Sequence, residues 1–216
     1  MLPILFENDD LLAIDKPEGL AVIPERAPGA TCVMQQVEAA RKGRHFVVHR
    51  IDKDVSGVLL VAKTAAAHRH LNGLFEARRV RKTYLAVLHG HISTEQGRIT
   101  APIRQFGSSR MGVDSRGGKP SLTLYRVTGS FGRFTQVAAH PITGRRHQLR
   151  VHFYHLGHPI VGDHWYGDLE VQRVYPRLML HARSIALALP DGSPVHITAP
   201  PPVSFTTALA ALRAAR

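Results

Sequence analysis

The residues best suited to chemistry are an aspartate and the two cations beside it. In HRIDKDVSGVLLVAK (residues 49–63), Asp52 lies between Arg50 and Lys53, just before a Ser-Gly pair and an apolar run typical of a buried strand. We expect the nearby positive charge to favour the ionised carboxylate. An acid at a strand entrance, where a rigid scaffold meets solvent, could serve as a nucleophile or a base. A turn cap or a surface ion pair is the structural alternative for the same residue.

A second candidate group is a set of arginines in TGRRHQLRVH (residues 143–152). If this segment is helical, Arg146 and Arg150 share a face at a spacing of four residues, where like charges repel. The neighbouring face carries Arg145 and Leu149. The arginine pair would be favourable if an anion bridged it, either a phosphate or a carboxylate such as Asp52. A solvated basic helix is the alternative interpretation.

Tyr84, in RKTYLAVLHG, is the third candidate. Strand alternation places it on one face with Lys82 and Ala86. Its ring could stack on a base, or its hydroxyl could take part in chemistry. A tyrosine in a strand is more often a core residue, so this position gains weight only together with the other two groups.

The histidines do not predict a metal site. The chain has 14 of them, and His152, His155 and His158 recur at steps of three. Zinc sites need tight ligand geometry with supporting carboxylates, and the first acid after these residues is Asp163. Gly157 also interrupts the helical spacing. No phosphate-binding glycine motif is present, so we expect neither a metal nor a cofactor.

The charge of the chain indicates a polyanionic partner. Lys and Arg number 28 against 16 Asp and Glu, a formal net charge of +12. No carboxylate occurs from 115 to 162, and seven cations fall there: Arg116, Lys119, Arg126, Arg133, Arg145, Arg146 and Arg150. Nucleic acid is the usual partner of such a basic face. A merely basic surface is the alternative, and cations spread over strand-like segments argue against a membrane-binding helix.

Composition also bounds the setting. The 216 residues suit one domain, 1–216, with 44% hydrophobic and 20% charged residues as in an ordinary globular protein. The single cysteine, Cys32, excludes a disulfide framework and favours a reducing compartment. The N-terminal MLPILFENDD lacks the basic start of a secretory signal, and no apolar run approaches the roughly 20 residues of a membrane span. We expect a cytoplasmic monomer.

Periodicity and breakers predict the elements that must position these residues. Strands are expected at 10–15, 57–63, 82–89, 121–128, 133–139, 179–189 and 194–199. Helices are expected at 31–42 and 64–79, opened by Thr31 and Thr64 as N-caps, at 145–156 with Gly157 as the C-terminal glycine, and at 203–213. The segment 104–120 has many breakers and is expected to be a mobile basic loop. Strands do not alternate regularly with helices, so the class is α+β with a mixed or antiparallel sheet.

Taken together, the three groups resemble the core motifs of the RluA family of RNA pseudouridine synthases. The motifs are HRIDKDVSGVLLVAK, RKTYLAVLHG and TGRRHQLRVH in that order, with further matches in IDKPEGL (14–20), GDHWYG (162–167) and LHA (180–182). The resemblance runs from about residue 4 to residue 200. Val55 stands where the family usually has Thr, and Ile51 replaces the commoner Leu, but neither change removes a charged or nucleophilic group.

The resemblance implies a pseudouridine synthase fold, in which a long bent mixed or antiparallel sheet with flanking helices and loops surrounds a basic cleft. It implies that Asp52 attacks the target uridine, that Tyr84 packs on the base, and that Arg150 pairs with Asp52. Arg50 would enter the RNA stack and help to expel the target nucleotide. His49, Arg145, Arg146 and Leu149 would complete the RNA-binding residues.

The implied partner is RNA, in the form of a tRNA or rRNA stem-loop, and the family uses no cofactor or metal. Some relatives carry an additional N-terminal RNA-binding module, whereas here the motifs begin too early for one. Two other functions stay open on the sequence: a non-catalytic RNA-binding module with the same basic face, and a metal-dependent nuclease. The first predicts loss of Asp52, Tyr84 or Arg150, and the second predicts clustered carboxylates.

Overall fold

The computed structural model describes residues 2–25, 29–107 and 109–214. The chain forms two compact units. Unit 1 comprises Met1–Lys82 and Ala182–Pro201, and unit 2 comprises Thr83–His181 and Pro202–Arg216. The chain passes between the units within strands β5 (Arg81–His89) and β11 (Leu180–Ala188) and again after Pro201.

Unit 1 is built on antiparallel strands. Strand β2 (Leu11–Lys16) pairs with β1 (Ile4–Glu7) and with β4 (Ser56–Ala62), and the short β3 (Phe46–Val47) also pairs with β4. Strand β11 pairs with β12 (Pro194–Thr198). In the register of β2 and β4, Lys16 lies opposite Gly57, so the IDKPEGL motif begins beside the residues that follow Asp52.

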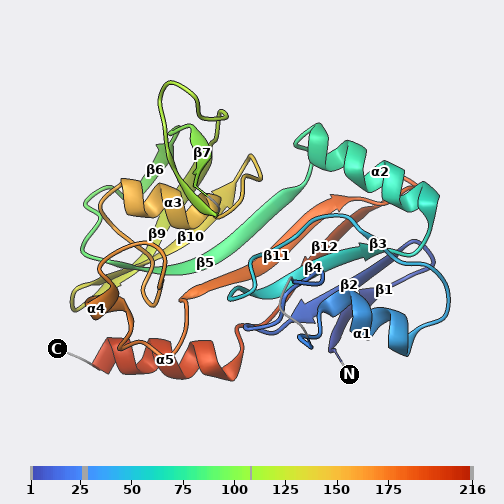
Figure 1. The fold of residues 1–216 in the computed structure, drawn as a ribbon, viewed down its shortest axis with the longest axis horizontal. Helices are drawn as coiled ribbons and strands as arrows, with labels where there is room; N and C mark the ends of the chain where they lie inside the picture. The colour runs from blue at the N-terminus through green and yellow to red at the C-terminus, as the bar shows by residue number, and fades with distance from the viewer. Residues whose placement is uncertain (1, 26–28, 108, 215–216) are drawn as a thin grey trace. The chain divides into compact units, whose positions relative to one another are not determined.

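Two helices cover opposite faces of the β2–β4 pair (Figure 1). Helix α1 (Val33–Ala40) buries Val33, Met34 and Val37 against one face. Helix α2 (Ala65–Glu76) buries Ala67 and Leu71 against the other. Because alternate side chains of a strand point to opposite faces, a strand covered on both sides is apolar throughout, and all seven residues of β4 are buried.

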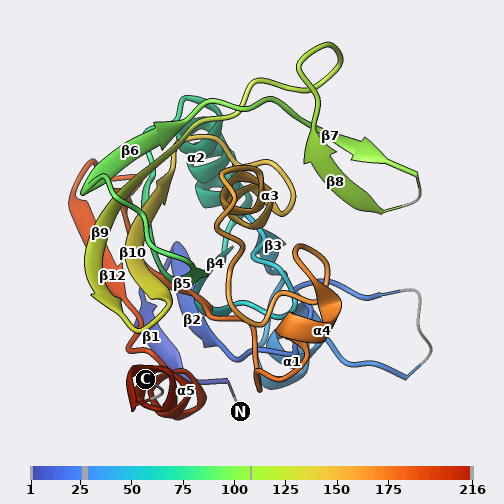
Figure 2. The same cartoon turned by 90° about the vertical axis from the view of Figure 1, so that its left-hand side faces the viewer.

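Unit 2 holds a second antiparallel run of strands. Strand β10 (Phe134–Pro141) pairs with β5 and with β9 (Thr123–Phe131), and β9 pairs with β6 (Gln96–Ile99). Strands β7 (Ile103–Phe106) and β8 (Arg110–Val113) form a separate hairpin, which lies beside α3 (Gln148–His155) in Figure 2. The unit is completed by α4 (Leu169–Gln172) and α5 (Val203–Ala214).

Helix α3 packs firmly into unit 2. Phe153 is fully buried and its ring meets Tyr125 of β9 edge-on, with the centroids 5.8 Å apart. His152 bonds to the Thr123 hydroxyl through Nδ1 at 2.9 Å and to the Ala101 carbonyl through Nε2 at 2.9 Å. On another side, Val151 packs with Ile103, Met111 and Tyr166. The helix is therefore a rigid support for the arginine that it carries.

The α+β class and the seven predicted strands are confirmed, as are helices at all four predicted places. Thr64 caps α2 by accepting the Ala67 N–H at 3.0 Å, and Gly157 follows α3 with a φ of +85°. The cap of α1 was wrongly placed, because Cys32 is its N-cap and donates its N–H to the Gln35 side chain at 3.0 Å. None of the helices in the described part of the chain has the length and apolar character needed to traverse a bilayer.

The prediction of a loop over 104–120 was wrong for 104–106 and 110–113, which belong to β7 and β8, whereas 114–118 form a turn outside any strand; residue 108 lies outside the described residues. Strands β7 and β8 are only four residues long, too short for periodicity to detect them. Burial of Met111 and an ion pair at 2.8 Å between Arg104 and Asp114 stabilise the hairpin instead. The short elements β1, β3, β6 and α4 were missed for the same reason of length.

Candidate active site

Asp52 occupies a turn directly before β4, as its position in the sequence predicted. The turn is closed by the Val55 N–H, which donates to the Asp52 carbonyl at 3.1 Å. Its neighbours Ile51 and Val55 are 7% and 2% exposed, whereas Asp52 itself is half-buried. Because the side chains of Ile51 and Val55 are buried, they anchor the turn in the protein interior, and Asp52 lies between them and solvent.

The buried ammonium group of Lys16 fixes the same turn. Its Nζ donates to the Lys53 carbonyl at 2.9 Å and to the carbonyls of Pro17 and Leu20 at 2.7 Å each. The Gly19 N–H also donates to the Lys53 carbonyl, at 2.9 Å. Lys16 thus ties the IDKPEGL segment to Lys53, the residue next to Asp52. The charge pattern could not reveal this function, and the sequence marked the segment only through its match to the motif.

The glycine after Ser56 is required by a close approach. Gly57 has a φ of +114°, and a Cβ there would lie 2.2 Å from the carbonyl oxygen of Ala182. Any other residue would displace the backbone at the start of β4. The Ser-Gly pair of the motif is therefore needed for the geometry of the strand entrance.

The two cations beside Asp52 have different environments. Arg50 is exposed to solvent. Lys53 is also exposed, but its Nζ binds the Glu25 carboxylate at 2.7 Å. The sequence predicted that both Arg50 and Lys53 would surround Asp52 with positive charge. Lys53 is instead paired with Glu25.

His49 is held as a neutral ring. Its Nε2 accepts the Leu60 N–H at 3.0 Å, and the ring stacks on Phe75 with a centroid distance of 5.0 Å. Burial, together with repulsion from Lys82, lowers the pKa of His49 to about 3. Protonation of Nε2 would also break the bond to Leu60, so this histidine stays uncharged near neutral pH.

This arrangement predicts an acid-sensitive contribution to stability. The unfolded chain protonates His49 near its ordinary pKa of 6.5, whereas the folded chain resists protonation until about pH 3. Stability is therefore lost as the pH falls through that window, at up to about 1.4 kcal/mol per pH unit. His49→Gln keeps a hydrogen-bond acceptor but does not titrate. In urea unfolding, the difference in unfolding free energy between wild type and this variant should therefore shrink from pH 6.5 to pH 4. A difference in unfolding free energy that stays constant with pH would contradict this account.

Tyr84 lies on β5, half-buried, opposite Ala139 of β10. The hydroxyl of the preceding Thr83 bonds to His140 Nδ1 at 3.3 Å. Two residues earlier, Lys82 stands 6.0 Å above the Phe75 ring, and burial lowers the pKa of Lys82 to about 8. Nothing in the sequence pattern pointed to a lysine with so low a pKa.

Arg150 forms a buried ion pair that sequence reasoning missed. Its Nε and Nη2 donate to the two carboxylate oxygens of Asp163, at 2.8 and 2.7 Å, and the two residues are 3% and 1% exposed. The pair uses two of the three guanidinium nitrogens, so it leaves Nη1 for other contacts. Asp52 belongs to unit 1 and Arg150 to unit 2, and their pairing stays a prediction.

Asp163 is itself positioned by its loop. Its Oδ1 accepts the N–H groups of Trp165 and Tyr166 at 3.0 and 3.2 Å. Gly162, just before it, has a φ of +74°, and a Cβ there would lie 1.9 Å from the Arg177 carbonyl oxygen. The GDHWYG match therefore marked this loop, although only the structure shows that its acid orients Arg150.

The predicted face shared by Arg146 and Arg150 is wrong, because α3 begins at Gln148 and its N-cap His147 has a left-handed φ of 54°. Gln148 Oε1 accepts from the Thr143 hydroxyl at 2.7 Å and from the Arg145 N–H at 3.0 Å, which holds the chain in a turn here. Arg146 is exposed. Leu149 is 5% exposed and packs as a core residue.

Two of the three histidines spaced at steps of three have separate hydrogen-bond partners. His152 bonds to Thr123 and Ala101, as described above, and His158 Nδ1 bonds to the His89 carbonyl at 2.9 Å. Across the described ranges, no three His, Cys, Asp or Glu side chains come together in a way that could hold a metal ion.

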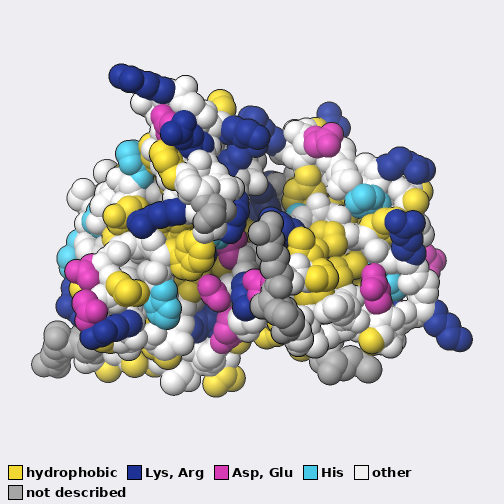
Figure 3. Space-filling model, viewed as in Figure 1, with side chains coloured by type: hydrophobic (Ala, Val, Ile, Leu, Met, Phe, Trp, Pro, Cys, Tyr) yellow, Lys and Arg dark blue, Asp and Glu magenta, His cyan; other side chains and the backbone are white. Residues whose placement is uncertain are grey.

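Exposed cations accompany this part of unit 2. Figure 3 shows Lys and Arg side chains gathered where Figure 1 places β7 and its neighbouring loops. The exposed cations of the acid-free region are Arg116, Lys119, Arg126, Arg133 and Arg146, and the β7–β8 hairpin adds Arg104 and Arg110. Such a surface attracts a polyanion at long range.

Comparisons with known proteins agree with this geometry. The family described as RNA pseudouridylate synthase matches residues 10–155. The chain is 38% identical to ribosomal large subunit pseudouridine synthase C of Vibrio cholerae, over 98% of this chain and 70% of that protein. It is 37% identical to the dual-specificity RNA pseudouridine synthase RluA of Yersinia pestis, over 89% of this chain and 96% of that protein.

A solved structure supports the same conclusion. Human RNA pseudouridylate synthase domain containing 1 superimposes with a TM-score of 0.81 at 30% identity, covering 99% of this chain and 95% of that one. The chain therefore belongs to the RNA pseudouridylate synthase family. Within that family it is of the RluA type, and it is an isomerase that converts uridine in RNA to pseudouridine.

Proposed function

We propose that this enzyme isomerises a specific uridine in a tRNA or rRNA stem-loop, with Asp52 as the nucleophile and the target base flipped out of the RNA. The observation that carries the proposal is the construction of the Asp52 turn. A half-buried carboxylate is held on buried Ile51 and Val55 and is tied through Lys53 to the buried Lys16 ammonium. Nucleophiles need such fixed support, because small displacements cost large factors in rate.

The proposed reaction conserves every atom of the uridine. The Asp52 carboxylate attacks the target nucleotide and the bond between the ribose C1′ and base N1 breaks. The base turns in place, its C5 forms the new bond to C1′, and the bond between the nucleotide and Asp52 breaks, which returns the free carboxylate. The C5 proton leaves to solvent and N1 gains a proton, so no oxidant, metal or cofactor is consumed.

Other residues support this reaction in our proposal. Tyr84 packs on the base and assists removal of the C5 proton, and Arg150, oriented by Asp163, supports the charge of Asp52. Arg145 and Arg146 bind the RNA backbone, while buried Leu149 shapes the base-binding surface. His49, as a neutral ring bonded to Leu60, positions the segment that carries Arg50. The two units act as one catalytic domain, in a cytoplasmic monomer.

Release of tritium tests the proposal. RNA labelled at carbon 5 of uracil loses its label when the base rejoins ribose through that carbon. Separate tRNA and rRNA pools incubated with the purified protein would establish the reaction and the substrate class together. No release from either pool, from protein shown to bind RNA, would favour a non-catalytic RNA-binding module instead.

Arg50→Ala is expected to slow catalysis on structured RNA far more than on RNA whose target base is already unpaired. Extruding a stacked base costs a few kcal/mol, and the exposed Arg50 side chain is proposed to fill the space that the base leaves. Single-turnover rates on a matched hairpin and on a bulged version of it would measure the difference. Equal losses on both substrates would assign Arg50 to general binding.

RNA affinity should fall steeply with salt. Each phosphate contact contributes about −0.7 to the slope of log affinity against log salt concentration, so removing one contacting cation should flatten that slope by about 0.7. The exposed residues Arg116, Lys119 and Arg146 are expected to show it, with Arg145 as a fourth candidate. Arg173→Ala is the matched control, because Arg173 is exposed but already paired with Glu170. Salt titrations of binding would test each variant, and an unchanged slope in all four would place the RNA on another surface.

A further inference from the structure

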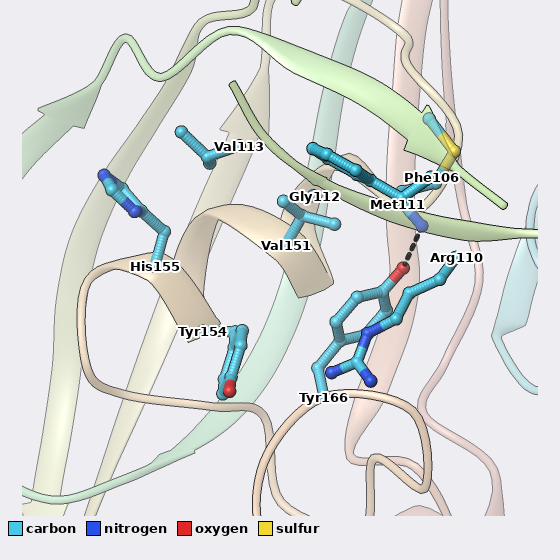
Figure 4. Close-up of a pocket in the computed structure, with 9 residues that line it drawn as sticks. All are labelled: Phe106, Arg110, Met111, Gly112, Val113, Val151, Tyr154, His155 and Tyr166. Carbon is cyan, nitrogen blue, oxygen red and sulfur yellow. Dashed lines mark hydrogen bonds between the residues drawn. The ribbon is translucent and has the colours of Figure 1, made fainter. Parts of the chain in front are cut away.

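Unit 2 contains a pocket that none of the proposed catalytic residues lines. It lies between the β7–β8 hairpin, helix α3 and Tyr166 of the 162–167 loop (Figure 4), with a volume of about 320 Å³. Ligand pockets begin at about this size. The hairpin contributes Phe106 and Arg110, and the helix contributes Val151, Tyr154 and His155.

Three aromatic rings, those of Phe106, Tyr154 and Tyr166, line the pocket. Tyr166 forms a rigid floor, since it is 1% exposed and its hydroxyl bonds to the Met111 N–H at 3.3 Å and to His147 Nδ1 at 2.8 Å. The Tyr154 ring stands 6.1 Å from it, centroid to centroid. Tyr154 and Phe106 are 44% and 40% exposed, so both rings offer surface to a ligand.

The charge of the pocket favours a polyanionic occupant. The Arg110 guanidinium stands 5.9 Å from the centre of the Tyr166 ring, and His155 lies at the opposite side of the pocket in Figure 4. None of the nine lining residues carries a carboxylate. The exposed rings of Tyr154 and Phe106 beside the exposed Arg110 combine a stacking platform with a phosphate contact, as in proteins that bind unpaired nucleotides.

We propose that this pocket binds an unpaired nucleobase of the RNA substrate, distinct from the uridine that reacts. The base stacks on the exposed rings of Tyr154 and Phe106, and Arg110 contacts its phosphate. This inference rests on the proposed function, because it takes RNA as the occupant. Its consequence is selectivity for RNA that presents a second unstacked base at a fixed distance from the target.

The chain offers a built-in reporter for the test. Its single tryptophan, Trp165, meets the His147 ring edge-on at 5.5 Å, and His147 bonds to the Tyr166 hydroxyl. Trp165 fluorescence would be titrated with a short oligoadenylate, which contains no uracil, and with an abasic oligomer of equal phosphate number. Wild type should bind the oligoadenylate roughly ten-fold more tightly than the abasic oligomer.

Phe106→Ala and Tyr154→Ala should reduce that base preference to near two-fold while leaving abasic affinity unchanged. Both side chains are partly exposed, so both variants should fold. Leu124→Ala, an exposed apolar residue of β9 at 39% exposure that does not line the pocket, is the matched control and should keep the preference. Asp52→Asn should keep it as well.

Two results would overturn the base pocket: no preference for the oligoadenylate in wild type, or equal losses for both oligomers in Phe106→Ala and Tyr154→Ala. The former would also leave a small apolar ligand or a peptide as the occupant. Tritium release from labelled tRNA and rRNA by the same preparation keeps the two proposals separate. Normal release without base preference rejects only the pocket, whereas base preference without release rejects the proposed catalytic function.

Discussion

Asp52→Asn is expected to abolish pseudouridine formation, with a rate loss of at least about three orders of magnitude. The amide retains the shape of the carboxylate but is neither a nucleophile nor a base. Fold and RNA affinity should stay near wild type, because the turn is held by Ile51, Val55 and Lys16 and not by the Asp52 side chain alone. Single-turnover tritium release under saturating enzyme would measure the loss.

Asp54→Asn provides a matched control. Asp54 is an exposed acid two residues further along the same turn, so its replacement makes the same change of net charge. Near wild-type activity in this variant would separate loss of the nucleophile from a general electrostatic effect. Substantial activity in Asp52→Asn, or an equal loss in Asp54→Asn, would remove Asp52 from its proposed role.

The long elements could be predicted because their signals are local. Strand β4 is a continuous apolar run that both α1 and α2 cover, and α2 begins at a threonine that caps it. The hairpin β7–β8 could not be predicted, since its stability comes from Met111 packing on residues far away in the sequence. The start of α3 was misplaced for a related reason: Gln148 bonds to Thr143 and to Leu122, and these contacts hold the preceding residues out of the helix.

The residues of the candidate site likewise fall into those that the sequence could predict and those that it could not. Asp52, Arg50 and Tyr84 could be chosen from residue type, spacing and resemblance, because each belongs to a contiguous motif. The supporting residues are buried charges whose partners are distant in sequence, such as Lys16 with the Lys53 carbonyl and Arg150 with Asp163. A sequence shows that such residues are present, whereas the burial that makes their pairing obligatory is a property of the fold.

Removing the Asp163 carboxylate is expected to have a large effect on both stability and catalysis. Arg150 and Asp163 are buried together, and taking away one partner of a buried pair costs about 3–5 kcal/mol. That is a large share of the roughly 5–15 kcal/mol that stabilises a folded protein. Asp163→Ala should therefore lower the free energy of unfolding by several kcal/mol, and it should slow the reaction because Arg150 loses the two bonds that orient it.

A double-mutant cycle distinguishes this pairing from two independent contributions. Arg150→Met removes the charge that would otherwise be left buried, so the double variant Asp163→Ala/Arg150→Met should be more stable than the sum of the single losses predicts. Asp163→Asn is the milder comparison, because an amide oxygen can still accept the Trp165 and Tyr166 N–H groups. Urea unfolding would give the coupling, and single-turnover rates on folded protein would give the catalytic effect. If the single losses added within about 0.5 kcal/mol, the pair would not be coupled. If Asp163→Asn also kept the wild-type rate, Asp163 would not position Arg150 for catalysis.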